Sequence, residues 1–379
     1  MATQETKLTR PFRADQVGSY LRPDELVEAR NAHAKGEIGS DRLRTVEDKA
    51  IRELVAMQED LGLRCVTDGE FRRQSWNRDF LGGFDNVVEQ KGNLKLYHRN
   101  IDGSNDAANQ ISGWAVTGKF RRSRPIQVDD FKFLKSVARV TPKTCITSPT
   151  LLHFRGGREA IDKKTYPDMA QFFADVAAAY RDEIRDLYAA GARYIQLDDT
   201  NFAYLCDARF RDAVKEMGED PVELVDTYVK LINDSLRDKP ADLLTAIHLC
   251  RGNSSKGGAA TGGYDVIGGQ LFPNLNVDAF FLEYDDARAG GFEALKDVPN
   301  GKSVVLGLIT TKRADLESKD DLRRRIDEAA KIVPMENLCL SPQCGFASGV
   351  HQKRRIEISE EMAKVKLLVE TARDVWGDN

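Results

Sequence analysis

His248 and Cys250 stand two positions apart at the end of an apolar run, residues 243–247, that is typical of a β-strand. In an extended segment residues i and i+2 point to the same side, so the imidazole and the thiol can bind one ion. Nitrogen and sulfur donors together favour zinc. Two later strand-like runs also end in potential ligands, Glu283 and Cys344. If the three runs are parallel strands of one barrel, all four side chains converge on a single Zn2+ ion.

The expected metal site has the composition of a catalytic zinc site. Three protein ligands and one exchangeable position are typical of such sites, and a thiol that enters this position loses its proton. Two cysteine ligands make the ion a weaker Lewis acid than an all-histidine site, which favours reaction at a sulfur over activation of water. We expect Glu283 to be the ligand that leaves the zinc ion when the thiol binds. The pattern therefore predicts an enzyme that generates a nucleophilic thiolate.

Acidic and hydroxyl side chains follow other strand-like runs. Glu70 lies in the segment Thr-Asp-Gly-Glu, and Asp198 and Asp199 lie in Gln-Leu-Asp-Asp-Thr. Two carboxylates at the mouth of a barrel can bind the ammonium group of an amino acid, although strand-end acids also cap helices. Asp199 is a further candidate catalytic residue. Ser19, after Gly18, can donate to a substrate carboxylate or cap a turn.

Two more candidates follow the third and seventh strand-like runs. Lys312 comes after the seventh run, near the place where barrel enzymes often bind anionic groups. If it faces inward it can protonate a leaving group or hold an anion, and the alternative is a surface lysine. Phe154 follows the third run and offers either an aromatic face to a substrate or ordinary packing.

The elements that must position these residues are eight strand-like runs that alternate with helical segments. Alternating strands and helices imply a parallel sheet with helical crossovers, and eight such units predict an α/β fold, the (β/α)8 TIM barrel, with its active site at the carboxyl ends of the strands. The expected strands are residues 12–19, 64–70, 143–149, 194–199, 243–250, 279–285, 303–309 and 337–342. The clearest helical periodicity lies in residues 41–61, 168–190, 221–237, 320–333 and 357–375.

We expect one zinc-binding domain over residues 1–379, with two departures from a plain barrel. Residues 81–139 are rich in Gly, Asn and Lys and contain alternating runs, which predicts an insertion after the second strand with an antiparallel hairpin near the barrel mouth. The glycine-rich residues 252–269 are either an active-site lid or a solvated connection.

Composition excludes several partners. The 379 residues carry a net charge of -4, so no strong field favours nucleic acid or an anionic membrane. Residues 1–7 show no apolar signal core, and no run of about 18 apolar residues predicts a membrane span. We therefore expect a cytoplasmic protein whose six cysteines are reduced thiols. A small thiol is the expected substrate. The oligomeric state is left open, and a homo-oligomer is one possibility.

These residues together resemble the cobalamin-independent methionine synthase family, specifically its catalytic C-terminal barrel, over nearly the whole chain. The resemblance implies zinc held by His248, Cys250, Glu283 and Cys344. It also implies homocysteine held by three residues in matching motifs: Ser19 in Val-Gly-Ser-Tyr, Glu70 in Asp-Gly-Glu and Asp198 in Gln-Leu-Asp.

The chain departs from the long-form enzymes of that family at three places. Lys312 stands where those enzymes carry a histidine that protonates the folate, Tyr204 stands near their partner acid, and Phe154 replaces their folate-stacking tryptophan. The identity of the alkyl donor is therefore open.

The expected reaction is zinc-dependent transfer of an alkyl group, most simply methyl, to homocysteine. The short architecture also resembles epoxyalkane:coenzyme M transferases, so opening of an epoxide by a thiol is the second reading. A metal-free barrel resembling uroporphyrinogen decarboxylase and a zinc- or thiol-binding protein without catalysis are the remaining alternatives.

Overall fold

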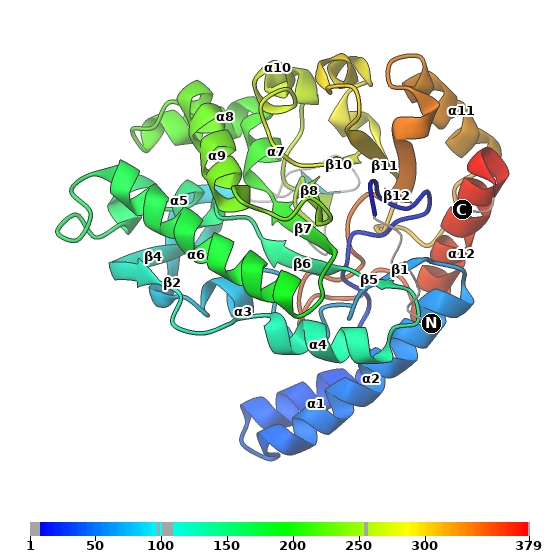
Figure 1. Cartoon of the computed structure of the whole chain (residues 1–379), viewed down its shortest axis with the longest axis horizontal. Helices are drawn as coiled ribbons and strands as arrows, with labels where there is room; N and C mark the ends of the chain where they lie inside the picture. The colour runs from blue at the N-terminus through cyan, green and yellow to red at the C-terminus, as the bar shows by residue number, and fades with distance from the viewer. Residues whose placement is uncertain (1–7, 97–98, 101–108, 254–256, 378–379) are drawn as a thin grey trace.

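A parallel β-sheet forms the centre of the protein in the computed structural model, which describes residues 8–96, 99–100, 109–253 and 257–377 (Figure 1). Six strands pair in the order β12-β11-β10-β8-β7-β6, all parallel. A further parallel pair, β1 with β5, lies next to them. The strands are β1 Cys65–Val66, β5 Thr141–Pro142, β6 Thr144–Thr147, β7 Tyr194–Asp199, β8 Leu244–Leu249, β10 Ala279–Glu283, β11 Ser303–Ile309 and β12 Leu338–Pro342.

The predicted first strand, residues 12–19, closes the barrel through isolated bridges. Ala14 bridges to Leu340 in β12, and Ser19 bridges to Gly69, both in parallel. The Asp15 carboxylate accepts a hydrogen bond from the backbone N–H of Gln16 at 2.8 Å, so this N–H is not available for pairing with a neighbouring strand. The fold is thus the expected (β/α)8 barrel, with a first strand that pairs less than its sequence predicts.

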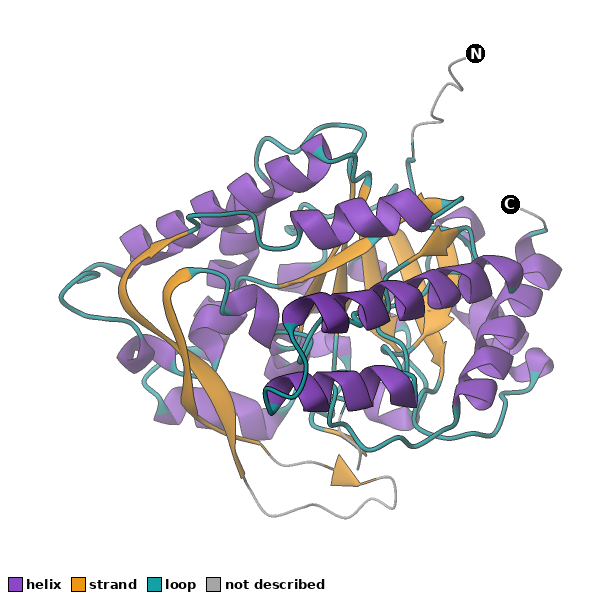
Figure 2. Ribbon diagram, turned by 90° about the horizontal axis from the view of Figure 1, so that it is seen from below, coloured by secondary structure: helices purple, strands orange, loops and turns teal. Residues whose placement is uncertain are grey.

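Helices surround the strands (Figure 2). The five predicted helices are confirmed with ends shifted by at most a few residues: α2 Ser40–Asp60, α6 Met169–Ala189, α9 Pro221–Leu236, α11 Lys319–Ala330 and α12 Ile358–Trp376. Caps define their starts, since the Asp168 and Asp220 side chains accept backbone N–H groups at the beginning of α6 and α9. None of the described helices has the length and apolarity needed to cross a membrane.

The sequence patterns did not single out the other helices. They are α1 Asp24–Ala34, α3 Arg78–Leu81, α4 Val128–Val137, α5 Leu151–Phe154, α7 Asn201–Leu205, α8 Ala208–Glu216 and α10 Gly268–Leu271. Short 3-10 helices are η1 Gly157–Ala160, η2 Tyr264–Val266, η3 Ala287–Ala289, η4 Glu293–Asp297 and η5 Met335–Asn337.

Within residues 81–139, strands β2 Asp85–Leu96 and β4 Asn109–Arg121 form an antiparallel pair, visible as the long ribbon at the edge of Figure 2. The following helix α4 contacts α2, α6 and β5, so this part of the segment belongs to the helical layer of the barrel. A second small pair joins β3 Arg99–Asn100 to β9 Gly257–Gly258. The glycine-rich segment, residues 252–269, for which a lid and a solvated connection were both considered, includes residues 254–256, which lie outside the described residues, as do residues 1–7.

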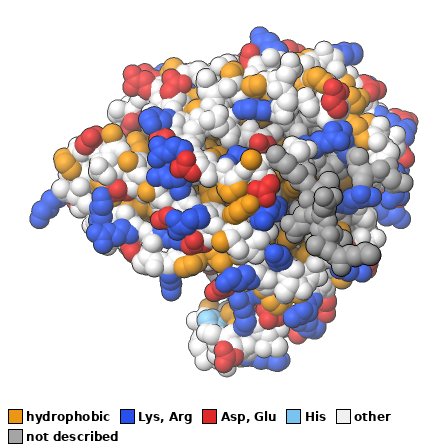
Figure 3. All heavy atoms as spheres, viewed as in Figure 1, with side chains coloured by type: hydrophobic (Ala, Val, Ile, Leu, Met, Phe, Trp, Pro, Cys, Tyr) orange, Lys and Arg blue, Asp and Glu red, His pale blue; other side chains and the backbone are white. Residues whose placement is uncertain are grey.

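The barrel has two apolar cores. The larger core lies between the strands and the helices. The smaller core fills the barrel interior with residues from the inner faces of the strands, such as Tyr194, Ala246 and Phe281. Because alternate strand residues share a face, Gln196 and Asp198 follow Tyr194 along the same inner face toward the carboxyl end of β7. On the outer face seen in Figure 3, basic and acidic side chains are interspersed.

Candidate active site

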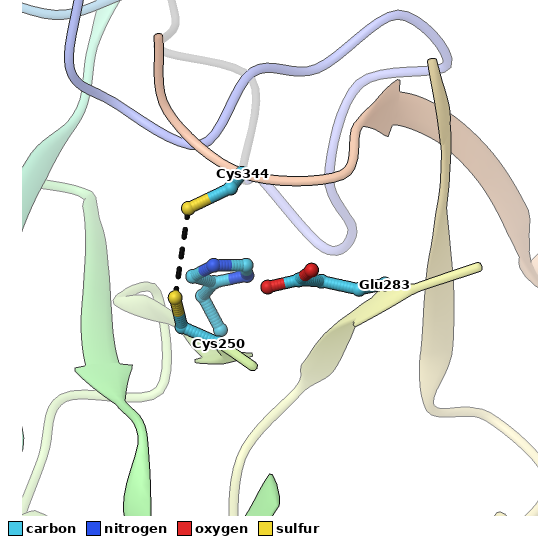
Figure 4. A group of neighbouring side chains, drawn as sticks. Cys250, Glu283 and Cys344 are labelled. Atoms are coloured by element: carbon cyan, nitrogen blue, oxygen red, sulfur yellow. Dashed lines mark hydrogen bonds between the residues drawn. The ribbon is translucent and has the colours of Figure 1, made fainter. Parts of the chain in front are cut away.

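The structure brings the four predicted metal ligands together at the carboxyl ends of β8, β10 and β12. One ligand atom from each of His248, Cys250, Glu283 and Cys344 lies within 4.8 Å of all the others. The sulfur atoms of Cys250 and Cys344 are 3.6 Å apart. Figure 4 shows Cys250, Glu283 and Cys344 pointing toward one another from separate segments of chain.

The chemistry of these side chains fits a zinc ion. Both ring nitrogens of His248 are buried and have no hydrogen-bond partner in the described part of the chain. Such an unsatisfied group costs about 1–3 kcal/mol, which coordination would recover. The hydrogen bond with Cys344, together with burial, raises the pKa of the Cys250 thiol. One nitrogen, two sulfurs and a carboxylate form a donor set that matches four-coordinate zinc.

Basic groups hold the Glu283 carboxylate in place. Its Oε1 accepts the backbone N–H of Arg251 at 2.7 Å, and its Oε2 accepts from Arg288 at 3.0 Å. Lys312 faces inward, with its Nζ 3.9 Å from Glu283 and 3.8 Å from Asp285. Lys312 is not among the residues that line the cavity beside this group. Partners of this kind orient a metal ligand and tune its charge.

A cavity of about 190 Å³ opens beside the four-residue metal group. His248, Cys250 and Cys344 line it, and so do the predicted substrate residues Ser19, Glu70 and Asp198. Its remaining walls include Tyr204, which the resemblance places near the partner acid of the long-form enzymes, and Gly252 and Asn253 of the glycine-rich segment. The sequence analysis did not single out the other lining residues, which are Val17, Trp76, Arg155, Thr200, Gly345 and Ser348. Trp76 could have been noticed, because an isolated tryptophan six positions after Glu70 stands in a polar segment.

Glu70 and Asp198 form an acidic pair in this cavity. One carboxylate oxygen of Glu70, one carboxylate oxygen of Asp198 and the sulfur of Cys145 all lie within 4.8 Å of one another. Burial, partly offset by Arg73 at 3.5 Å, raises the pKa of Glu70 to about 7, and burial also raises the pKa of Asp198. Glu70 Oε2 has no hydrogen-bond partner among the described residues. Two adjacent carboxylates repel each other when both are ionised, so the pair favours a cationic ligand group.

Unusual backbone geometry places these side chains. Gly69 and Glu70 have φ values of 65° and 60°, the left-handed region, which costs a residue other than glycine about 1–3 kcal/mol. Such strain is typical of functional sites. A Cβ at Gly345 would lie 2.0 Å from Ser19 Oγ, so the absence of a side chain there leaves the serine its place in the cavity wall.

Four predicted site residues, Phe154, Asp199, Glu283 and Lys312, are not among the residues that line the cavity. The contacts of Phe154 are those of its packing alternative. Phe154 packs its ring against Tyr204 and Tyr228 at centroid distances of 6.2 and 6.3 Å, and the next residue, Arg155, lines the cavity instead. Asp199 accepts hydrogen bonds from the Thr150 hydroxyl and from the first backbone N–H groups of α7. Its carboxylate is therefore used to hold the start of that helix.

Comparison with known proteins gives relatives over the full length of the chain. The protein is 41% identical over 387 residues to the uncharacterized protein YxjH of Bacillus subtilis, an alignment that covers 99% of this chain and 98% of the relative. A solved structure from Listeria monocytogenes is 35% identical, has a TM-score of 0.78 and covers 98% of this chain and 99% of its own.

More distant relatives have names that describe an activity. A 5-methyltetrahydropteroyltriglutamate–homocysteine methyltransferase of Blochmanniella pennsylvanica is 21% identical, and the alignment covers 96% of this chain and 44% of the relative. A B12-independent methionine synthase of Shewanella sp. W3-18-1, solved with selenomethionine, shares the fold with a TM-score of 0.69 at 19% identity and covers 96% of this chain and 97% of its own. The family model described as "Cobalamin-independent synthase, Catalytic domain" matches residues 12–374. The chain therefore belongs to the cobalamin-independent methionine synthase family, as a catalytic domain.

Proposed function

We propose that this protein is a zinc-dependent transferase that moves an alkyl group, most simply methyl, onto the sulfur of homocysteine. The observation that carries the proposal is one cavity lined both by soft metal ligands and by two carboxylates. An amino-acid thiol has matching groups, a sulfur and an ammonium, separated by a short chain. The names of the methyltransferase and synthase relatives support the same reaction.

In this proposal His248, Cys250, Glu283 and Cys344 hold the zinc ion. Bound there, zinc supplies positive charge that lowers the pKa of a thiol brought beside it. The carboxylates of Glu70 and Asp198 accept hydrogen bonds from the substrate ammonium group. This contact offsets the cost of burying the ionised carboxylate, which, with a smaller contribution from Asp198, raises the pKa of Glu70.

Other residues around the cavity orient the substrate and exclude water. The Ser19 hydroxyl donates to the substrate carboxylate, and the rings of Trp76 and Tyr204 cover the cavity walls. We assign Lys312 to charge balance at Glu283, because it contacts that acid and does not line the cavity. The alkyl donor is not specified by these contacts, since they account only for the thiol.

Binding of matched thiols tests the proposal. Zinc is first quantified in the purified protein, and homocysteine, coenzyme M and 2-mercaptoethanol are then titrated while proton release is measured. We expect one zinc per chain and proton release at the lowest concentration with homocysteine, because it alone carries the ammonium group. Tighter binding of coenzyme M would favour the epoxide-opening reaction instead. Binding of all three thiols without zinc would contradict the proposal.

A donor panel then completes the assignment. Homocysteine is incubated with methyltetrahydrofolate, a methylcorrinoid or a small epoxide, and the sulfur product is identified by mass spectrometry. Methionine formation that depends on zinc supports the proposal. A product alkylated only by the epoxide would reassign the protein to the second class.

A further inference from the structure

Arg155 is a buried cation that faces the cavity. It follows helix α5, is 7% exposed and lines the cavity with Cys250 and Tyr204. Its Nη1 donates to the carbonyl oxygen of Ser112 in β4 at 3.0 Å, and its guanidinium carbon lies 5.8 Å from the centre of the Trp76 ring. Its Nε is buried without a hydrogen-bond partner.

In the described part of the chain no ion pair is found for Arg155, and the same is true of the buried Arg13, Arg22 and Arg251. Of these four arginines, Arg155 is the one that lines the cavity. Arg73, in contrast, lies 3.5 Å from Glu70. Burial lowers the pKa of Arg155, and none of the groups that oppose this shift is a carboxylate. A buried guanidinium without an acid is costly, and a bidentate anion is the ligand that best recovers the cost.

Arg155 lines the same cavity as Tyr204 and as Cys250 and Cys344 of the metal group. The proposed function assigns the two charged groups of the amino acid to other residues, the ammonium to Glu70 and Asp198 and the carboxylate to Ser19. An anion bound by Arg155 is therefore a group of the second substrate, held in the cavity that also contains the reacting sulfur.

We propose that Arg155 is an anion subsite for the alkyl donor, which carries a carboxylate, sulfonate or phosphate near the alkyl group that it transfers. The inference rests on the proposed function, because that function assigns Glu70 and Asp198 to the thiol substrate. It adds the chemical class of the second substrate. It also explains why an arginine lines the wall at the point where an aromatic contact from Phe154 was expected.

Alkylation of Cys250 tests the subsite without substrate or turnover. Cys250 is the least buried of the free cysteines. The full chain is freed of metal with a chelator and treated with iodoacetate or iodoacetamide, and labelling is followed by peptide mass spectrometry. In each reaction the Cys250 sulfur forms a bond to the reagent carbon, iodide leaves and the thiol proton goes to the buffer. The two reagents differ mainly by one negative charge.

We expect the iodoacetate-to-iodoacetamide rate ratio at Cys250 to exceed that of free cysteine. The ratio should fall about tenfold in R155M, as for loss of one charge-assisted hydrogen bond. R155K should keep most of the preference, because it keeps the charge. R158M is the matched control, since the Arg158 guanidinium donates to the carbonyl oxygens of Ile161 and Tyr166 and does not line the cavity. A ratio in folded R155M equal to that of the wild type would overturn the proposal.

Competition by small anions on the wild-type chain provides a second readout that needs no variant. Acetate, methanesulfonate and methyl phosphate are added at equal ionic strength, and the anion that slows iodoacetate labelling most identifies the class of donor group. Protection by none of the three would overturn the subsite even if R155M fails to fold. Because zinc and homocysteine are absent from both experiments, a negative result is distinguishable from failure of the proposed reaction.

Discussion

Two buried polar clusters share the barrel interior, and they differ in how completely their hydrogen bonds are satisfied. In the first, Lys143 donates to Asp15 at 2.9 Å, to the carbonyl oxygen of Gln16 and to Gln196 at 3.0 Å. Tyr194 donates to the other oxygen of Asp15 at 2.9 Å. The three protons of the ammonium group are matched by three acceptors, so this Asp15–Lys143 cluster is complete without a ligand.

The cavity is the contrasting region. His248 has two unpartnered ring nitrogens, and Glu70 Oε2 and Arg155 Nε are also unpartnered within the described residues. Buried polar atoms in folded proteins are usually paired, and unpaired ones also occur elsewhere in this chain, for example on Arg22 and Arg355. Around the cavity the unpaired atoms belong to an imidazole, a carboxylate and a guanidinium, so we infer that these groups bind ligands. Gln196 joins the two regions, because its amide donates to Asp198 at 2.7 Å. Paired groups in the Asp15–Lys143 cluster stabilise the barrel, whereas we propose that the unpaired groups of the cavity bind ligands.

The largest expected effect is loss of metal on substitution of a ligand. C250S should lose zinc retention and alkyl transfer together, by more than about a hundredfold, because oxygen is a much poorer zinc ligand than thiolate. The melting temperature of the metal-free protein should stay close to the wild-type value. C206S is the control, since Cys206 is buried away from the cavity lining and its sulfur hydrogen-bonds the carbonyl oxygen of Phe202. A C250S protein that transfers the alkyl group without zinc would show that the unpaired groups of the cavity do not serve as a metal site.

The Asp15–Lys143 cluster should behave in the opposite way. K143M leaves the Asp15 carboxylate buried without its cation, which should lower the free energy of unfolding by about 3–5 kcal/mol. Urea denaturation of the metal-free protein measures this loss. The double variant D15N/K143M should recover part of it, because no isolated charge remains. If K143M reduced zinc content and not stability, our assignment of the cluster would be wrong.

A smaller effect is expected at the acidic pair. E70Q removes a charge-assisted contact with the substrate ammonium, so KM for homocysteine should rise about tenfold to a hundredfold. The affinity for 2-mercaptoethanol, which has no ammonium group, should change little and serves as the internal control. Equal weakening of both thiols would show that Glu70 acts on the fold and not on the amino group.

Glu361 extends the comparison to a buried acid that pairs with no lysine among the described residues, and its effect should depend on pH. Its Oε1 accepts the backbone N–H of Leu21 at 2.8 Å, and burial raises its pKa to about 8. The folded-state pKa is above the unfolded value of about 4.3, so the stabilising contribution is complete below that pH and is lost as the pH rises through about 8.

The variant E361Q keeps the acceptor but cannot ionise. Its melting temperature should therefore exceed the wild-type value by a margin that grows from about pH 5 to pH 8 and then levels off. Thermal melts across this range measure the margin. A constant difference at all pH values would show that Glu361 is ionised throughout in the folded protein.

The sequence predicts the barrel better than the details of its closure. Apolar strand runs and helical periodicity repeat over many residues, so β7, β8 and the five long helices follow from local pattern. In the described part of the chain the first strand pairs through isolated bridges at Ala14 and Ser19, and one of its backbone donors, the N–H of Gln16, is bound by the Asp15 side chain. Helix α4 was assigned to the insertion because composition does not reveal which neighbour a helix contacts.

The sequence by itself determined the metal group. His248 and Cys250 share a face through strand alternation, and the carboxyl ends of parallel strands meet at one edge of the barrel, so Glu283 and Cys344 had to come close to them. Only the tertiary structure decided which of Phe154 and Arg155 faces the cavity. Successive residues of a helical turn point about 100° apart, so a shift of one position turns a side chain from the apolar core to the site. No periodic pattern in the sequence fixes that rotation in a helix as short as α5.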